Sequence, residues 1–142
     1  MRTAVLGASR TAMVPEGVER LRGPEELGGV FWDVLALTAA GCALLEPAGA
    51  VPCACGTLLV PGDRSGLARR LRAEQVVSCG FSPRDSLTFS SLEEDRAVLC
   101  VQRALARPDG GRVEPREVPL ERTGGQPPEE LLLLGGLRLL LG

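Results

Sequence analysis

The chain has 142 residues, enough for one domain that buries roughly two-thirds of the surface exposed in its unfolded state. It contains no histidine, lysine or tyrosine, which excludes histidine catalysis, a phosphate-loop lysine and a Schiff-base lysine. All 16 basic residues are arginine and the net charge is −2, so composition gives no reason to expect a nucleic-acid or membrane partner.

The first predicted element is a short strand from Thr3 to Leu6. Further on, Pro24 and two following acids are typical of a helix start. Five apolar residues and one threonine then recur at helical spacing, at Leu27, Val30, Phe31, Val34, Leu35 and Thr38. We therefore predict a helix from Pro24 to Gly41, or as far as Glu46, with Trp32 and Asp33 at its surface or boundary.

The middle of the chain predicts a strand, a short helix and a second strand. The strand Thr57–Val60 ends at a Pro-Gly-Asp turn, and a short amphipathic helix is expected around Leu67 and Leu71. Residues 75–79 form the next predicted strand. A crossover of this length makes a βαβ unit, so the two strands should be parallel.

After Pro83 the pattern changes to that of antiparallel strands. Residues 86–90 alternate between apolar and polar, residues 97–101 form an apolar run, and residues 108–111 are a turn sequence. Residues 113–120 contain two prolines, so this strand should lie at an edge of the sheet. The predicted fold class is α/β: a small two-layer or three-layer domain with a βαβ unit followed by an antiparallel meander.

The end of the chain predicts a connection over residues 123–128. Pro127-Pro128-Glu129-Glu130 is typical of a helix start, and the very apolar segment Leu131–Leu141 follows it. This segment is either the last element of the core or a face that binds a protein partner, and we favour the core. We expect a single domain over residues 1–142, with an N-terminal part (1–55), a central core (56–120) and a C-terminal apolar segment (121–142).

Residues 56–120 resemble the latter part of the central domain of the Mur ligases, the ATP-dependent enzymes of bacterial peptidoglycan precursor synthesis. Three phrases carry the resemblance: Leu58-Leu59-Val60-Pro61-Gly62-Asp63, then Val76-Val77-Ser78-Cys79-Gly80-Phe81-Ser82, then Val118-Pro119-Leu120. The resemblance implies a related topology, with a cell-wall or nucleotide-sugar context by analogy only.

The departures from that family concern its chemistry. The family's phosphate-loop lysine, its modified lysine and its magnesium-binding histidine have no possible counterpart in a chain without lysine and histidine. Of the family's Asn-x-Asp-Asp turn only Asp63 remains. The resemblance therefore implies a non-catalytic relative without the ATP-binding loop, and we expect no cofactor.

Polar residues follow both strands of the βαβ unit, where α/β sheets place their ligands. A ligand site at this edge of the sheet would include Asp63, Arg64, Ser78, Gly80, Ser82 and Arg84. Arg84 could bind a phosphate or carboxylate. The alternative, which we favour, is structural: Asp63 caps the following helix, and Ser82 and Pro83 turn the chain.

Four cysteines could supply thiolates to zinc: Cys53, Cys55, Cys79 and Cys100. The single residue between Cys53 and Cys55 is an unusual spacing for zinc ligands. We instead expect small buried hydrophobic residues and reduced thiols, because the chain opens without a secretory signal and so is expected in the cytoplasm.

Three functions remain open from the sequence. The first is a non-catalytic domain that binds a small molecule or a protein. The second is a small enzyme with its site at the strand ends near Asp63 and Cys79. The third is an assembly protein that uses the leucine-rich segment Leu131–Leu141 as its interface.

Overall fold

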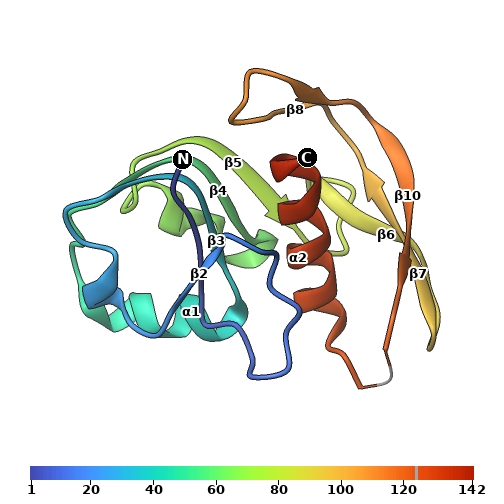
Figure 1. The fold of residues 1–142 in the computed structure, drawn as a ribbon, viewed down its shortest axis with the longest axis horizontal. Helices are drawn as coiled ribbons and strands as arrows, with labels where there is room; N and C mark the ends of the chain where they lie inside the picture. The colour runs from blue at the N-terminus through green and yellow to red at the C-terminus, as the bar shows by residue number, and fades with distance from the viewer. Residues whose placement is uncertain (124) are drawn as a thin grey trace.

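The computed structural model describes residues 1–123 and 125–142, and it shows an α/β domain built on one eight-stranded sheet (Figure 1). The sheet contains β1 (Thr3–Leu6), β2 (Glu19–Leu21), β3 (Phe31–Leu37), β4 (Ala54–Pro61), β5 (Ala73–Cys79), β6 (Leu87–Leu92), β7 (Arg96–Val101) and β10 (Arg116–Glu121). A small hairpin is formed by β8 (Leu105–Ala106) and β9 (Arg112–Val113). The helical elements are η1 (Pro24–Glu26), α1 (Ala39–Leu45), η2 (Glu46–Ala48), η3 (Gly62–Ala68) and α2 (Pro128–Leu141).

The sheet has a parallel half and an antiparallel half, in the strand order β10-β7-β6-β5-β4-β3-β1-β2. Strands β2, β1, β3, β4 and β5 are parallel to their neighbours, which confirms the predicted parallel pairing of β4 and β5. Strand β7 pairs antiparallel with β6 and with β10. The predicted meander is therefore confirmed, and β10 lies at the edge, as its prolines require.

Side chains alternate between the two faces of the sheet and build two cores. On β4, Leu59 packs beneath α2, whereas Leu58 and Val60 pack on the opposite face with α1 and η3. The domain is thus three-layered, because helical elements cover both faces of the central parallel strands β3 and β4. The C-terminal segment belongs to the core, since α2 buries Leu131, Leu132, Leu133, Leu134, Leu137 and Leu140 against the sheet.

The predicted helix from Pro24 to Gly41 is wrong. Only the single turn η1 forms at its start, and residues 31–37 are the strand β3 between β1 and β4. A parallel strand buried on both faces is almost continuously apolar, so its sequence also contains residues at helical spacing. The helix that does form, α1, begins eight residues before the turn at Pro47, with Thr38 as its N-cap.

Trp32 is also placed differently from the prediction, whereas half-buried Asp33 lies at the boundary as expected. The Trp32 ring is fully buried, its Nε1 donates to the Leu27 carbonyl at 3.3 Å, and the Arg2 guanidinium lies 4.6 Å from the ring centroid. A strand alternates its faces, so a position outside a helical stripe can point straight into the core.

Two smaller predictions need correction. The amphipathic helix expected around Leu67 and Leu71 is the 3₁₀ segment η3 followed by turns, although both leucines are buried. The strand expected over residues 113–120 is divided, because residues 112–113 pair with β8 and β10 begins only at Arg116, after Pro115. The expected connection over residues 123–128 includes Gly124, which lies outside the described residues.

In residues 1–123 and 125–142, every helix is too short or too polar to cross a membrane.

Candidate functional site

In the parallel half of the sheet, the connections between strands change from one face of the sheet to the other. The connection from β1 to β2 passes over the α2 face, where Ala12 packs, whereas the next three connections pass over the other face, where Leu27, Cys42 and Leu67 pack. The carboxyl ends of the neighbouring strands β1 and β3 therefore lead to opposite faces. Such switch points leave a crevice beyond the strand ends, and open α/β sheets bind their ligands there.

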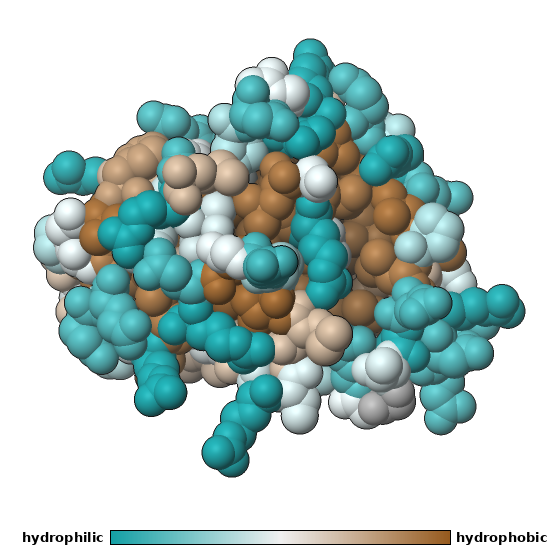
Figure 2. Space-filling model, viewed as in Figure 1, coloured by the Kyte–Doolittle hydropathy of each residue, from teal (hydrophilic) through white to brown (hydrophobic). Residues whose placement is uncertain are grey.

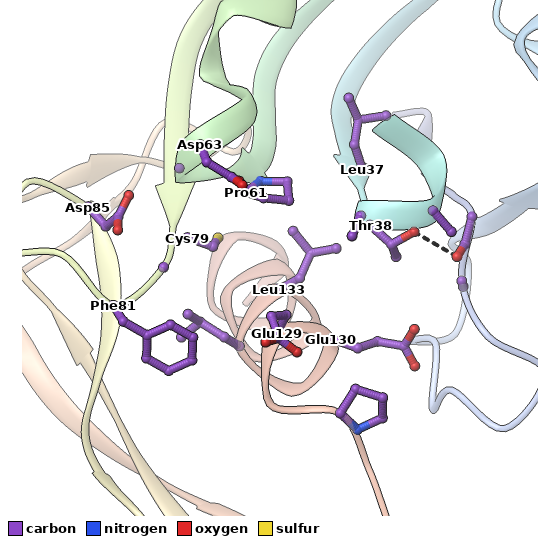
Figure 3. Close-up of a pocket in the computed structure, with 18 of the residues that line it drawn as sticks. Leu37, Thr38, Pro61, Asp63, Cys79, Phe81, Asp85, Glu129, Glu130 and Leu133 are labelled. Atoms are coloured by element: carbon purple, nitrogen blue, oxygen red, sulfur yellow. Dashed lines mark hydrogen bonds between the residues drawn. The ribbon is translucent and has the colours of Figure 1, made fainter. Parts of the chain in front are cut away.

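A cleft of about 1020 Å³ opens at this place. Its walls come from the loops that follow β1, β3, β4 and β5, and from the first turns of α2 (Figure 3). Leu37, Cys79, Leu132 and Leu133 are among its apolar lining residues, and the polar ones stand at the loop ends. This combination of a mainly apolar wall with a few polar groups is typical of small-molecule sites.

Glycines bring the elements beside the cleft unusually close together. A Cβ at Gly41 would overlap the carbonyl oxygen of Leu6, and a Cβ at Gly7 would overlap the backbone of Gly41. The Thr38 hydroxyl donates to the Gly7 carbonyl at 2.7 Å and accepts from the Gly41 amide at 3.0 Å. The start of α1 is therefore fixed directly on the end of β1, which gives one wall of the cleft a rigid shape.

Asp85 is the most deeply buried charged residue of the cleft, with 7% of its surface exposed. Its Oδ2 accepts a hydrogen bond from the Ser82 amide at 3.0 Å. The carboxylate lies against the glycines that follow β4 and β5, because a Cβ at Gly62 or Gly80 would overlap it. No local pattern in the sequence distinguishes Asp85, because the space for its carboxylate is left by Gly62 and Gly80.

Four of the six predicted ligand-site residues line the cleft: Asp63, Gly80, Ser82 and Arg84. The other two lie outside it. Arg64 forms an ion pair with Glu46, and the Ser78 hydroxyl accepts from the Ser86 amide at 3.0 Å. Asp63 does not cap the following 3₁₀ segment, whose N-cap position is held by Pro61. Residues 82–85 do form the expected turn, closed by the Asp85 amide on the Ser82 carbonyl.

The remaining charged groups of the cleft stand at its rim. Glu130 of α2 accepts hydrogen bonds from the amide and the hydroxyl of Ser9, which ties α2 to the loop after β1. Glu129 and Arg10 are exposed on the same rim. Phe81 is 60% exposed and its ring faces the first turns of α2 in Figure 3.

The four candidate zinc ligands do not come together. Cys55 packs on the α1 face of the sheet and Cys79 on the α2 face, so the sheet separates their thiols. Within the described residues, no group of three or more metal-ligating side chains could hold a metal ion. Cys53, Cys55 and Cys79 are buried, as expected of small hydrophobic residues, and Cys100 is half-buried.

The environment of Cys79 opposes thiolate chemistry. Burial raises the pKa of the Cys79 thiol, and the negative charge of Asp85 raises it further. A nucleophilic cysteine needs a lowered pKa, from a nearby cation or a helix N-terminus. Cys79 therefore lines the cleft as a protonated, apolar group.

The chain matches no protein-family model, no curated protein and no solved structure.

Proposed function

We propose that this protein is a non-catalytic domain that binds a small organic molecule in the cleft beyond β1, β3, β4 and β5. The position of the cleft at the switch point between β1 and β3 carries this proposal. The closely packed glycines around Gly7 and Gly41 support it, because they preform one wall. A preformed cleft loses less conformational entropy when it binds a ligand.

The protonated state of Cys79 supports the non-catalytic part of the proposal. The alternative of a small enzyme would use Asp63 and Cys79 at these strand ends. Asp63 is exposed, and burial raises the pKa of the Cys79 thiol far above the range of a reactive thiolate. The residues near the strand ends thus favour recognition of a molecule over a reaction with it.

An assembly role for the leucine-rich segment has less support. Most leucines of α2 are used within the domain, and only Leu139 and Leu141 remain half-buried. Figure 2 does show apolar surface along α2 and on the sheet beside it. The Mur ligase resemblance and the cytoplasmic location stay predictions.

A thermal-unfolding screen tests the proposal. Nucleotides, UDP-sugars, muropeptide precursors, amines and zinc would each be added to the purified protein. A ligand at 100 times its Kd stabilises the folded state by about 2.7 kcal/mol, which raises the midpoint by on the order of 5–10 °C.

Two matched variants test whether a compound that stabilises the protein binds in the cleft. Ala40→Phe fills the cleft from the exposed surface of α1, whereas Ala43→Phe adds the same ring to an exposed position of α1 outside the cleft. We expect Ala40→Phe to abolish the shift and Ala43→Phe to retain it. A shift that survives in both variants would place binding elsewhere and contradict the proposal, and so would a screen without any shift.

A further inference from the structure

We infer that the ligand carries a cationic group on a planar apolar body, with the cation bound by Asp85 and the body packed against Phe81. This inference rests on the proposed function and specifies the chemistry that the cleft would recognise. It follows from three independent features: a buried carboxylate, the charge of the lining and an exposed aromatic ring.

The buried carboxylate has unused hydrogen-bonding capacity. An ionised carboxylate offers about four lone-pair positions, and the structure fills only one of them at Asp85, with the Ser82 amide. The Oδ1 atom accepts no hydrogen bond from the residues that the structure describes. More than nine-tenths of Asp85 is buried, and the residue lines the cleft. Hydrogen-bond donors on a ligand in the cleft would fill the remaining acceptor positions of this carboxylate, and hydrogen bonds to a charged group are stronger than those between neutral groups.

The charge of the lining favours a cation over an anion. The charged residues around the cleft are Arg10, Asp63, Arg84, Asp85, Glu129 and Glu130, so four acids face two arginines. Both arginines are exposed at the rim of the cleft, whereas Asp85 is buried in its wall. The first turn of α2 would normally attract an anion, but Glu129 and Glu130 oppose one there. A phosphate near these groups would be repelled at close range.

The planar body is inferred from Phe81. This residue follows Gly80 directly after β5, and its ring is 60% exposed at the rim of the cleft. One side of the ring is supported by Phe89, with a centroid separation of 6.1 Å and an interplanar angle of 37°. In Figure 3 the ring lies on the side of the cleft next to α2. A flat ligand ring placed there would bury apolar surface and gain aromatic contact.

The test uses three indoles that share a two-carbon linker and differ in the group at its end: tryptamine (a cationic ammonium), tryptophol (a neutral hydroxyl) and indole-3-propionate (an anionic carboxylate). Their Kd values would be measured by titration into ¹⁵N-labelled protein. We expect tryptamine to bind at least about tenfold more tightly than indole-3-propionate, with tryptophol between them. We also expect Asp85→Asn to reduce tryptamine binding to the level of tryptophol.

Two further variants control the experiment. Glu94→Gln removes one exposed negative charge in the turn between β6 and β7, outside the cleft, and should leave all three affinities unchanged. Phe81→Ala removes an exposed ring and should weaken all three ligands by a similar factor while their order is kept. This second variant tests the stacking part of the inference even if Asp85→Asn does not fold.

Equal binding of the three indoles, or tighter binding of the anion, would overturn the inference. So would tryptamine binding that is unchanged in Asp85→Asn, or the absence of binding by all three compounds at millimolar concentration. None of these results removes the proposed function, which is judged separately by the wider screen. A screen that finds only anionic ligands, all sensitive to Ala40→Phe, would support the cleft and reject this ligand class.

Discussion

Strands β4 and β7 are both internal strands of one sheet, yet they are buried differently. Both turn alternate residues towards α2, where Leu59 and Leu99 are fully buried. On the opposite face, Leu58 of β4 is also fully buried, whereas Val98 of β7 is only half-buried. Strands β1, β3 and β4 of the parallel half are therefore covered on both faces, whereas β7 in the antiparallel half is covered on one face only.

The connections explain this difference. Parallel strands need crossovers, and here these crossovers supply η1, α1 and η3 as the second covering layer. Antiparallel strands are joined by short turns, such as residues 93–95, which cover nothing. The same crossovers leave the loops that converge on the cleft. The crossover connections of the parallel half therefore form both the second helical layer over the sheet and the cleft at the strand ends.

The largest loss of stability is expected for a substitution in α2, the helix that packs on strands of both halves. Helix α2 contacts β3, β4, β5 and β6, and Leu137 on its inner face is fully buried. Leu137→Asp would place a charge in the core, which costs several kcal/mol out of a total stability of about 5–15 kcal/mol. We expect this variant to be unfolded by circular dichroism. Arg138→Asp, on the exposed side of the same helix, should lose only about 1 kcal/mol; equal damage by both variants would contradict the placement of α2.

A second pair of variants tests the unequal cover of the two halves. Leu58→Ala removes a fully buried side chain beneath α1 and η3, so we expect a loss of about 2–5 kcal/mol in urea unfolding. Val98→Ala removes a half-buried side chain from the uncovered face of β7, so we expect a loss below about 1 kcal/mol. Similar losses would mean that the antiparallel half is also covered on this face.

A third prediction concerns alkaline pH and the buried thiols of the parallel half. Burial raises the pKa of Cys42 to about 11 and of Cys55 to about 12, from an ordinary value of 9.0. Above pH 9 the unfolded chain loses these protons while the folded chain keeps them, so stability falls as pH rises towards 11–12. The fall is up to about 1.4 kcal/mol per pH unit for each thiol.

The measurement is urea unfolding between pH 8 and pH 10.5, for the wild type and for a Cys42→Ala, Cys55→Ala double variant. The double variant should be less stable at pH 8, but its stability should fall less steeply with pH. An unchanged slope would show that these two thiols do not keep their protons in the folded state.

The sequence predicted most strands because short-range patterns determine them. The β4 strand is an apolar run that ends at a Pro-Gly-Asp turn, β7 is an apolar run, and the two prolines in residues 113–120 predict that β10 lies at the edge. Strand β3 was mistaken for a helix because burial on both faces removes the alternation that marks a strand. No local pattern reports that a strand lies between two others, since the neighbours of β3 come from distant parts of the chain.

The candidate site was only partly predictable for a similar reason. Asp63, Gly80, Ser82 and Arg84 were found because they follow parallel strands. Asp85 follows β5 in the same loop but was missed, since nothing local shows that Gly62 leaves space for its carboxylate. Ser9 and Glu130 lie 121 residues apart in the sequence and form a hydrogen bond beside the cleft. This contact depends on where α2 packs on the sheet, which no local sequence pattern indicates.

The central claim is that the parallel half binds a ligand at its strand ends. Its most direct test is a map of backbone amide shifts in ¹⁵N-labelled protein, on addition of the strongest compound from the screen. We predict that the perturbed amides gather after β1, β3, β4 and β5, at residues 7–9, 38–40, 62–63 and 80–85. Perturbations gathered instead at the smaller pocket around Val51 and Arg70, or along β7 and β10, would contradict the claim.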